Sequence, residues 1–419
     1  MSGAPTAGSP RSSLWVIAAG ATTMAVATLP AFFFGAFAVS IRADIGFSPA
    51  GIGMAASVFW GTSAASAPLV GRVVQALGAV RSVQLCGVGI AAALLPLALL
   101  AESWAALAVF LGFAGVANSI GQTAASLTLA EHGSEHNAGI AFGANQAAVP
   151  LASTVAGFAV PLFVVIGGWQ AAFLLGATGA VLLAILAPRA ILGSDRPARR
   201  ESEVAERSSK GAQPIDRSVI GLITAGAFLA AGAALTLTSY FVAFAVESGY
   251  SEGGGGTLFA LASLTSVVVR VIAGARLDRA QRLSGRRVNA LAPAGAILLI
   301  GSAGFALLAT AQVWSPALVV GTMLALGLGW SWAGLMTFAI VDLHRGAAAV
   351  ATGVVLTGVF TGGVVMPTAL GLVIDQVSYR TAWVAASACM GTAALLFLFA
   401  SAILSRRARQ TPEDPAAPT

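Results

Sequence analysis

The stretch LASLTSVVVRVIAGARLDR, residues 261–279, holds one arginine inside a run that is otherwise apolar. A helix needs about 20 mainly apolar residues to cross the hydrocarbon layer of a membrane. This run has that length, and it ends in charged residues, which is the pattern of a spanning helix that reaches an aqueous face. Arg270 is therefore expected within the membrane, where a charge is costly and needs a partner or a function.

Composition extends this pattern to the whole chain. Of its 419 residues, 57% are hydrophobic and 9% are charged, whereas a water-soluble domain carries about 25% charged residues. Apolar runs of spanning length recur and predict an all-α membrane protein with twelve transmembrane helices. The expected spans are 14–40, 51–70, 81–101, 104–130, 138–162, 168–191, 218–246, 255–276, 289–311, 314–341, 348–374 and 380–404.

The basic residues gather on one side of this map. Arg42 and Arg380 fall in loops on one side and Arg270 falls inside a span, while the rest of the 22 Lys and Arg fall on the other side. By the positive-inside rule the Lys- and Arg-rich side is cytoplasmic. Both termini are thus predicted in the cytoplasm, and the protein in the plasma (inner) membrane. The net charge of +6 then reports topology, and no nucleic-acid partner is expected.

Short sequences recur in the same order in the two halves of the chain. AFAV at 36–39 returns at 243–246, and GFS at 46–48 is echoed by GYS at 249–251. An ordered repeat of this kind predicts two pseudo-symmetric six-helix bundles, with substrate bound near the midplane between them. The predicted units are a cytoplasmic N-terminal tail (1–13), an N-terminal bundle (14–192), a cytoplasmic linker (193–217), a C-terminal bundle (218–405) and a cytoplasmic C-terminal tail (406–419).

Two loops carry a resemblance to a known family. GRVVQALGAVR at 71–81 and GARLDRAQRLSGRR at 274–287 resemble the signature loop G-x-x-x-D-R-x-G-R-R of the major facilitator superfamily of secondary transporters. The second copy has a four-residue insertion, and the first has Gln75 where the acid belongs. The resemblance implies the two-bundle fold, alternating access and a gating role for the matching residues. These are Gly71, Gly78, Arg81, Gly274, Asp278, Arg279, Arg286 and Arg287.

Arg270 supports two interpretations. Its guanidinium could reach the headgroups or brace the nearby loop through Asp278, or it could be the counter-ion of an anionic substrate. A guanidinium suits the second role because its fork matches a carboxylate and stays charged. The pattern R-x-x-x-G, from Arg270 to Gly274, is also similar to monocarboxylate and oxalate-type carriers, where this arginine contacts the substrate carboxylate.

Polar side chains near mid-depth are candidates for the lining of a substrate cavity. Asn118 and Gln122 are four residues apart and so share one face of a helix. Each polar group of this kind could instead bond a neighbouring helix, which contributes about 0.6 kcal/mol on average in membranes. The residues predicted to bind substrate are Arg270, Asn118, Gln122, Gln146, Trp330, Tyr240 and Thr361.

The function expected from these features is secondary active or facilitative transport of a small organic solute by alternating access. The solute is expected to be an organic anion, such as a monocarboxylate. The alternative is efflux of multiple drugs or other amphipathic compounds, although the antiporter signature G-x-x-x-G-P-x-x-G-G is absent from the fifth span. No nucleophile–base pair, HExxH or phosphate loop is visible, so neither an enzyme nor a cofactor or metal site is expected.

The positions of the acidic residues indicate whether transport is expected to be coupled to protons. Glu247, Asp342 and Asp375 all fall near span ends, and no acid lies near a span centre. This pattern favours a uniporter, or an anion carrier that uses Arg270 alone, and it leaves coupling to a proton through a terminal acid open. The expected partners are a small-molecule substrate and the lipid bilayer, with the chain acting as a monomer.

Overall fold

The computed structural model describes residues 10–132, 138–192, 216–284, 289–344 and 348–410. Within these ranges the chain is helical apart from short turns, and no strand occurs. The predicted all-α class is therefore confirmed. The predicted linker (193–217) lies outside the described residues except for its last two positions, and the outer parts of both predicted tails also lie outside them.

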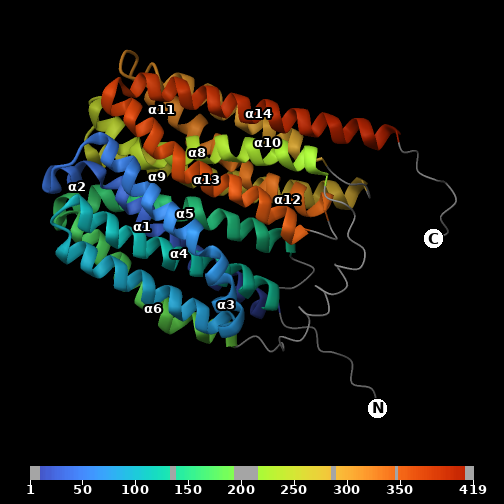
Figure 1. Cartoon of the computed structure of the whole chain (residues 1–419), viewed down its shortest axis with the longest axis horizontal. Helices are drawn as coiled ribbons and strands as arrows, with labels where there is room; N and C mark the ends of the chain where they lie inside the picture. Colours follow the sequence, from blue (N-terminus) through green and yellow to red (C-terminus); the bar gives the residue numbers. More distant parts are fainter. Residues whose placement is uncertain (1–9, 133–137, 193–215, 285–288, 345–347, 411–419) are drawn as a thin grey trace.

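The helices of each half follow one another in chain order (Figure 1). In the N-terminal half they are α1 (Pro10–Ala36), α2 (Ala38–Ile45), α3 (Pro49–Leu100), α4 (Trp104–His132), α5 (Ala138–Ile166) and α6 (Gly168–Leu192). In the C-terminal half they are α8 (Arg217–Glu247), α9 (Glu252–Ser284), α10 (Leu291–Leu308), α11 (Pro316–Thr322), η2 (Met323–Leu328), η3 (Gly329–Ser331), α12 (Trp332–Leu343), α13 (Ala348–Gln376) and α14 (Tyr379–Gln410). The first helix, α1, is as long as predicted but lies four residues earlier in the chain, whereas the last helix, α14, is longer than predicted and runs into the predicted tail.

Eleven helical segments of the described residues are long and apolar enough to cross a membrane. One of them, α3, has 52 residues, and its backbone leaves the helical region at Gly78 (φ 74°, ψ 171°). The Ser82 hydroxyl donates to the Val74 carbonyl over 3.5 Å, a contact that a straight helix places about 12 Å apart. The chain therefore folds back at Gly78, and α3 comprises two spans. The described residues thus hold the twelve predicted spans.

The break at Gly78 depends on the absence of a side chain. A φ of 74° is disfavoured by about 1–2 kcal/mol for residues with a Cβ, and Gly78 is one of four described glycines with positive φ. We expect Gly78→Ala to lower the melting temperature of the purified protein. Gly71→Ala is the matched control, because a Cβ at Gly71 meets nothing within 4 Å and its φ is not positive. Equal melting temperatures for the two variants would contradict this account of the break.

The two halves pack against each other mainly through two helix pairs, α5 with α9 and the first part of α3 with α13, and α1 also contacts α8. Exchanging the halves converts one pair into the other, as expected for the pseudo-two-fold repeat in the sequence. Figure 1 shows the helices running side by side between two faces of the molecule. We call the face where α8 begins and α14 ends the terminal face; there Arg407 pairs with Asp216. The other end of the bundle is called the opposite face.

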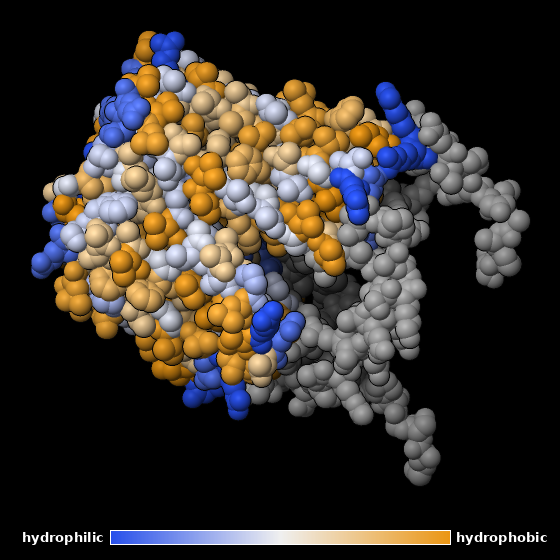
Figure 2. Space-filling view, viewed as in Figure 1, coloured by the Kyte–Doolittle hydropathy of each residue, from blue (hydrophilic) through white to orange (hydrophobic). Residues whose placement is uncertain are grey.

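The surface is that of a membrane protein. Apolar residues cover much of the flank in Figure 2, and hydrophilic residues gather mainly toward the two faces. Large apolar side chains on the flank remain open, for example Leu69 (66% exposed) and Leu395 (63% exposed). Such exposure in water would favour aggregation, whereas in a bilayer it places apolar groups in lipid. The chain is a multi-pass membrane protein.

Candidate functional site

A pocket lies between the two halves, with about 780 Å³ of space that includes its opening to solvent. Each half contributes four spans to its lining: α1, α3, α4 and α5 from the N-terminal half, and α8, α9, η3 with α12, and α13 from the C-terminal half. The pocket is therefore formed only when both halves are present, as the repeat in the sequence predicts.

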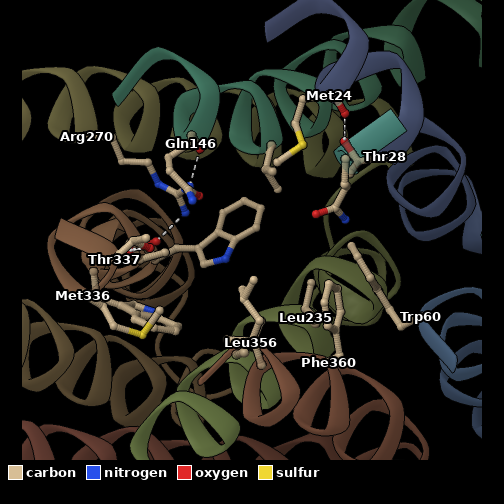
Figure 3. A pocket seen from close by; sticks show the side chains of 17 residues that line it. Met24, Thr28, Trp60, Gln146, Leu235, Arg270, Met336, Thr337, Leu356 and Phe360 are labelled. Atoms are coloured by element: carbon tan, nitrogen blue, oxygen red, sulfur yellow. Dashed lines mark hydrogen bonds between the residues drawn. The ribbon is translucent and has the colours of Figure 1, made fainter. Parts of the chain in front are cut away.

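Arg270, on α9, is held at one side of this pocket by backbone carbonyls from both halves. Its Nη1 donates to the Gln146 carbonyl of α5 over 2.5 Å, and its Nη2 donates to the Trp330 carbonyl of η3 over 2.6 Å. The guanidinium carbon lies 5.3 Å from the centre of the Trp330 ring, a cation–π distance. Figure 3 shows Arg270 beside Gln146, with Thr28 and Trp60 across the pocket.

The charge of Arg270 has no counter-ion among the residues that the structure describes. Its side chain is 5% exposed, and no described carboxylate pairs with it. Its Nε is buried without a hydrogen-bond partner, and no other charged residue of the described ranges lines the pocket. Carbonyl dipoles offset only part of the cost of a buried charge, so the arrangement favours an anion beside Arg270. The predicted contact of Arg270 with Asp278 falls outside the described residues, because the Asp278 side chain is not among them.

The Trp330 carbonyl, which accepts from Arg270 Nη2, lies in an irregular part of the tenth predicted span. The sequence predicts one continuous span over 314–341, but the structure divides it into α11, the π-helix η2, the 3₁₀-helix η3 and α12. A change of helix type alters which carbonyls have intrahelical partners, and π-helical turns often occur at functional sites. Four glycines lie between 321 and 334, and at Gly301–Gly329 the absence of side chains lets α10 and η3 meet backbone to backbone. The prediction of a regular tenth span is therefore corrected.

Four of the seven predicted substrate-binding residues line the pocket: Arg270, Gln122, Gln146 and Trp330. Among the described residues, the side-chain amides of Gln122 and Gln146 have no hydrogen-bond partner. Two free amides and one guanidinium are thus available to a bound solute.

The other three predicted residues lie outside the pocket lining. Asn118 is buried and donates through Nδ2 to the Ser63 hydroxyl over 2.8 Å. Thr361 is exposed and donates to the Thr357 carbonyl over 2.7 Å. Tyr240 lies near the opposite face, where it contacts the other half of the chain. Roles for these three in substrate binding remain predictions, and their contacts are structural.

Most of the remaining lining is apolar and was not selected from the sequence. It comes from six of the eight spans, all but α4 and α9, and includes Met24, Trp60, Leu235, Met336 and Phe360. In a chain that is 57% hydrophobic, nothing distinguishes an apolar residue that faces the cavity from one that faces lipid. Thr28 was also missed, although a threonine inside the apolar first span was a usable signal.

The predicted gating residues lie at the terminal face where they are described. Gly71 belongs to the first span of α3, Gly78 forms the fold-back, and Arg81 is exposed just after it. The segment 71–77, predicted as a loop, is helical up to Gly78.

In the second copy of the loop, Gly274, Asp278 and Arg279 belong to α9, which stays helical to Ser284. Arg279 is exposed. Arg286 and Arg287 lie outside the described residues. Gating by the residues of both copies therefore stays a prediction.

Comparison with known proteins agrees with this architecture. The family model of the Major Facilitator Superfamily matches residues 15–360, and the chain belongs to this superfamily. Its members are transporters that bind small molecules within the membrane, so the chain is a transporter and not an enzyme. No curated protein sequence matches it.

Two solved structures share the fold at low sequence identity. One is a bacterial homologue of the human lysosomal transporter Spinster, in an inward-facing and unoccupied conformation. It is 14% identical, with a TM-score of 0.67, covering 98% of this chain and 100% of that chain. The other is a mutant of the nucleoside transporter NupG, 13% identical with a TM-score of 0.70, covering 93% of this chain and 99% of that chain. At such identity they show the fold alone.

Proposed function

We propose that this transporter carries small organic anions that have one carboxylate and an apolar body, by alternating access. The observation that carries the proposal is the buried guanidinium of Arg270, which faces the inter-bundle pocket without a counter-ion. A carboxylate beside it would accept charge-assisted hydrogen bonds from the donors that the two carbonyls leave free. Monocarboxylates are the simplest solutes of this class.

The rest of the lining supports a solute with a single charge. In the part of the chain that the structure describes, Arg270 is the only charged lining residue, and apolar side chains form most of the other walls. A second carboxylate would lie in this apolar region without a cation, which is unfavourable at low dielectric constant. An apolar body gains from burial there at about 25 cal/mol per Å². Dicarboxylates are therefore expected to bind more weakly than monocarboxylates of equal length.

The proposal includes an orientation in the membrane. The terminal face would be cytoplasmic, because the arginines at this face include Arg81, Arg189, Arg276 and Arg279, and basic residues favour the cytoplasmic side of the plasma (inner) membrane. The units would be the bundles 14–192 and 218–405 joined by the cytoplasmic linker 193–217. One chain encloses the whole pocket, so a monomer suffices. Coupling to a proton would use an acid at a span end, such as Glu247 or Asp375.

A stability-shift screen tests the substrate class. The purified full chain is heated with monocarboxylates, dicarboxylates of matched length and the corresponding neutral amides. A ligand at 100 times its Kd stabilises the folded state by about 2.7 kcal/mol, and we expect this stabilisation from monocarboxylates alone. Equal stabilisation by the neutral amides would contradict an anion site.

The apolar lining also favours a second candidate, efflux of amphipathic compounds. Trp60, Trp330 and Phe360 could stack against flat apolar solutes of varied shape. Cells that overproduce the chain separate the two functions, because only an exporter of such compounds raises resistance to them. Unchanged resistance together with monocarboxylate binding supports the first candidate.

A further inference from the structure

Tyr240 joins the two halves of the chain, because its hydroxyl bonds to a backbone amide and a backbone carbonyl of a helix in the other half. It lies on α8, in the C-terminal half, and its side chain is fully buried. Its hydroxyl accepts from the Gly53 amide over 2.8 Å and donates to the Pro49 carbonyl over 2.9 Å, both at the start of α3.

The spacing of these two partners is that of a helical hydrogen bond. In a regular α-helix the amide of residue i donates to the carbonyl of residue i−4, and Gly53 is four residues after Pro49. The Tyr240 hydroxyl therefore bonds to an amide and a carbonyl that α3 itself pairs, since α3 is helical from Pro49 onward. Both backbone groups keep their helical partner when the hydroxyl withdraws.

The hydroxyl fits at this position only because Gly53 and Gly371, which lie beside it, have no side chain. A Cβ at Gly53 would lie 2.7 Å from Tyr240 Oη and would overlap the carbonyl of Pro367 on α13. A Cβ at Gly371, one turn further along α13, would overlap the same hydroxyl. Three helices from both halves thus converge on one phenol oxygen.

The contact belongs to the closed opposite face. In the same region the Ser57 hydroxyl lies 2.7 Å from the Thr368 hydroxyl, and Glu252 accepts from the Ser40 hydroxyl over 2.7 Å. Each of these bonds also joins the N-terminal half to the C-terminal half. The Tyr240 contact differs in that its partners are backbone groups, and it can break without leaving them unpaired because α3 closes its own ladder.

We propose that Tyr240 is a positioning residue of the transport cycle, whose hydroxyl holds the opposite face shut and withdraws when that face opens. The Gly53 amide and the Pro49 carbonyl then remain paired within α3, and the freed hydroxyl meets water in the opened vestibule. Opening costs less than it would if two backbone groups were stranded, so the closed and open states stay close in free energy. Alternating access requires such a balance.

Distances between spin labels test this role without any substrate, so failure here is distinct from failure of the proposed substrate class. Cys86 and Cys389 are replaced by alanine, and labels are placed at Glu102→Cys and Val313→Cys. Both sites are exposed at the opposite face, one on each half. In Tyr240→Phe, we expect the ratio of long-distance to short-distance populations to rise about threefold, the effect of one interhelical hydrogen bond in a membrane.

Tyr379→Phe is the matched control. Its ring packs 6.4 Å from that of Tyr240, and among the described residues its hydroxyl makes no hydrogen bond. The control distribution should equal that of the parent. A Tyr240→Phe distribution equal to the parent, or an equal shift in Tyr379→Phe, would overturn the proposal. If Tyr240→Phe does not fold, Gly371→Ala decides by the same criterion, because its Cβ would overlap the Tyr240 hydroxyl and lies no closer than 3.6 Å to backbone of another helix, while the tyrosine remains.

Discussion

Replacing Arg270 by alanine is expected to weaken monocarboxylate binding by about thirtyfold or more. Hydrogen bonds to a charged group contribute about 1.5–3 kcal/mol each, and Arg270 is the only cation that lines the pocket among the described residues. Arg270→Lys should bind with intermediate affinity, since it keeps the charge and loses the planar fork. Calorimetric titration of the purified variants with a monocarboxylate that stabilises the parent chain measures the change.

Arg276→Ala is the control for this prediction. Arg276 lies on the same helix, α9, and its side chain is exposed and outside the pocket lining. Its loss should leave the affinity unchanged. An Arg270→Ala variant that folds and binds as tightly as the parent would mean that Arg270 only braces the two halves through the Gln146 and Trp330 carbonyls.

Replacing Gly256 by leucine is expected to lower transport by roughly tenfold or more, because overpacking of a tight contact costs about 1–3 kcal/mol. Gly256, on α9, faces Gly157 and Val160 on α5, and its ideal Cβ would lie 2.5 Å from the Val160 Cβ and 2.8 Å from the Gly157 carbonyl oxygen. Backbone atoms cannot move aside, so the larger residue should force α5 and α9 apart at the opposite face. Uptake by proteoliposomes reports the loss.

Gly179→Leu is the matched control for the Gly256 variant. Gly179 lies within α6, and a Cβ there meets nothing within 4 Å. A leucine at that position should leave uptake unchanged. If Gly256→Leu transports at the parent rate, then close contact between α5 and α9 at the opposite face is not required for the cycle.

The fold was predictable because a bilayer imposes simple rules on sequence. The number of apolar runs of spanning length predicted the number of spans. The ordered repeat, for example AFAV at 36–39 and again at 243–246, predicted the two bundles. The failures were local. The segment 71–77 was expected as a loop because it is less apolar than its neighbours, yet a helix end can pass beyond the hydrocarbon layer. The irregular turns η2 and η3 have no sequence signature beyond their glycines.

The residues that line the pocket were predictable only where a polar or charged side chain interrupts an apolar run. Arg270, Gln122 and Gln146 are polar within apolar runs, and all three line the pocket. Tyr240 was selected by the same reasoning, but its depth in α8 brings it to the inter-bundle contact near the opposite face. The sequence gives the position of a residue along a helix, whereas the partner across the interface depends on how the two bundles dock.

Counterflow is the most direct measurement of the central claim, that Arg270 binds a carboxylate in a pocket opened alternately to each face. Proteoliposomes containing the parent chain, Arg270→Ala or Arg276→Ala are loaded with an unlabelled monocarboxylate and diluted into the labelled compound. We expect transient accumulation of label with the parent and with Arg276→Ala, and none with Arg270→Ala. Equal accumulation with all three proteins, or accumulation with none of them for any monocarboxylate that stabilises the chain, would contradict the claim.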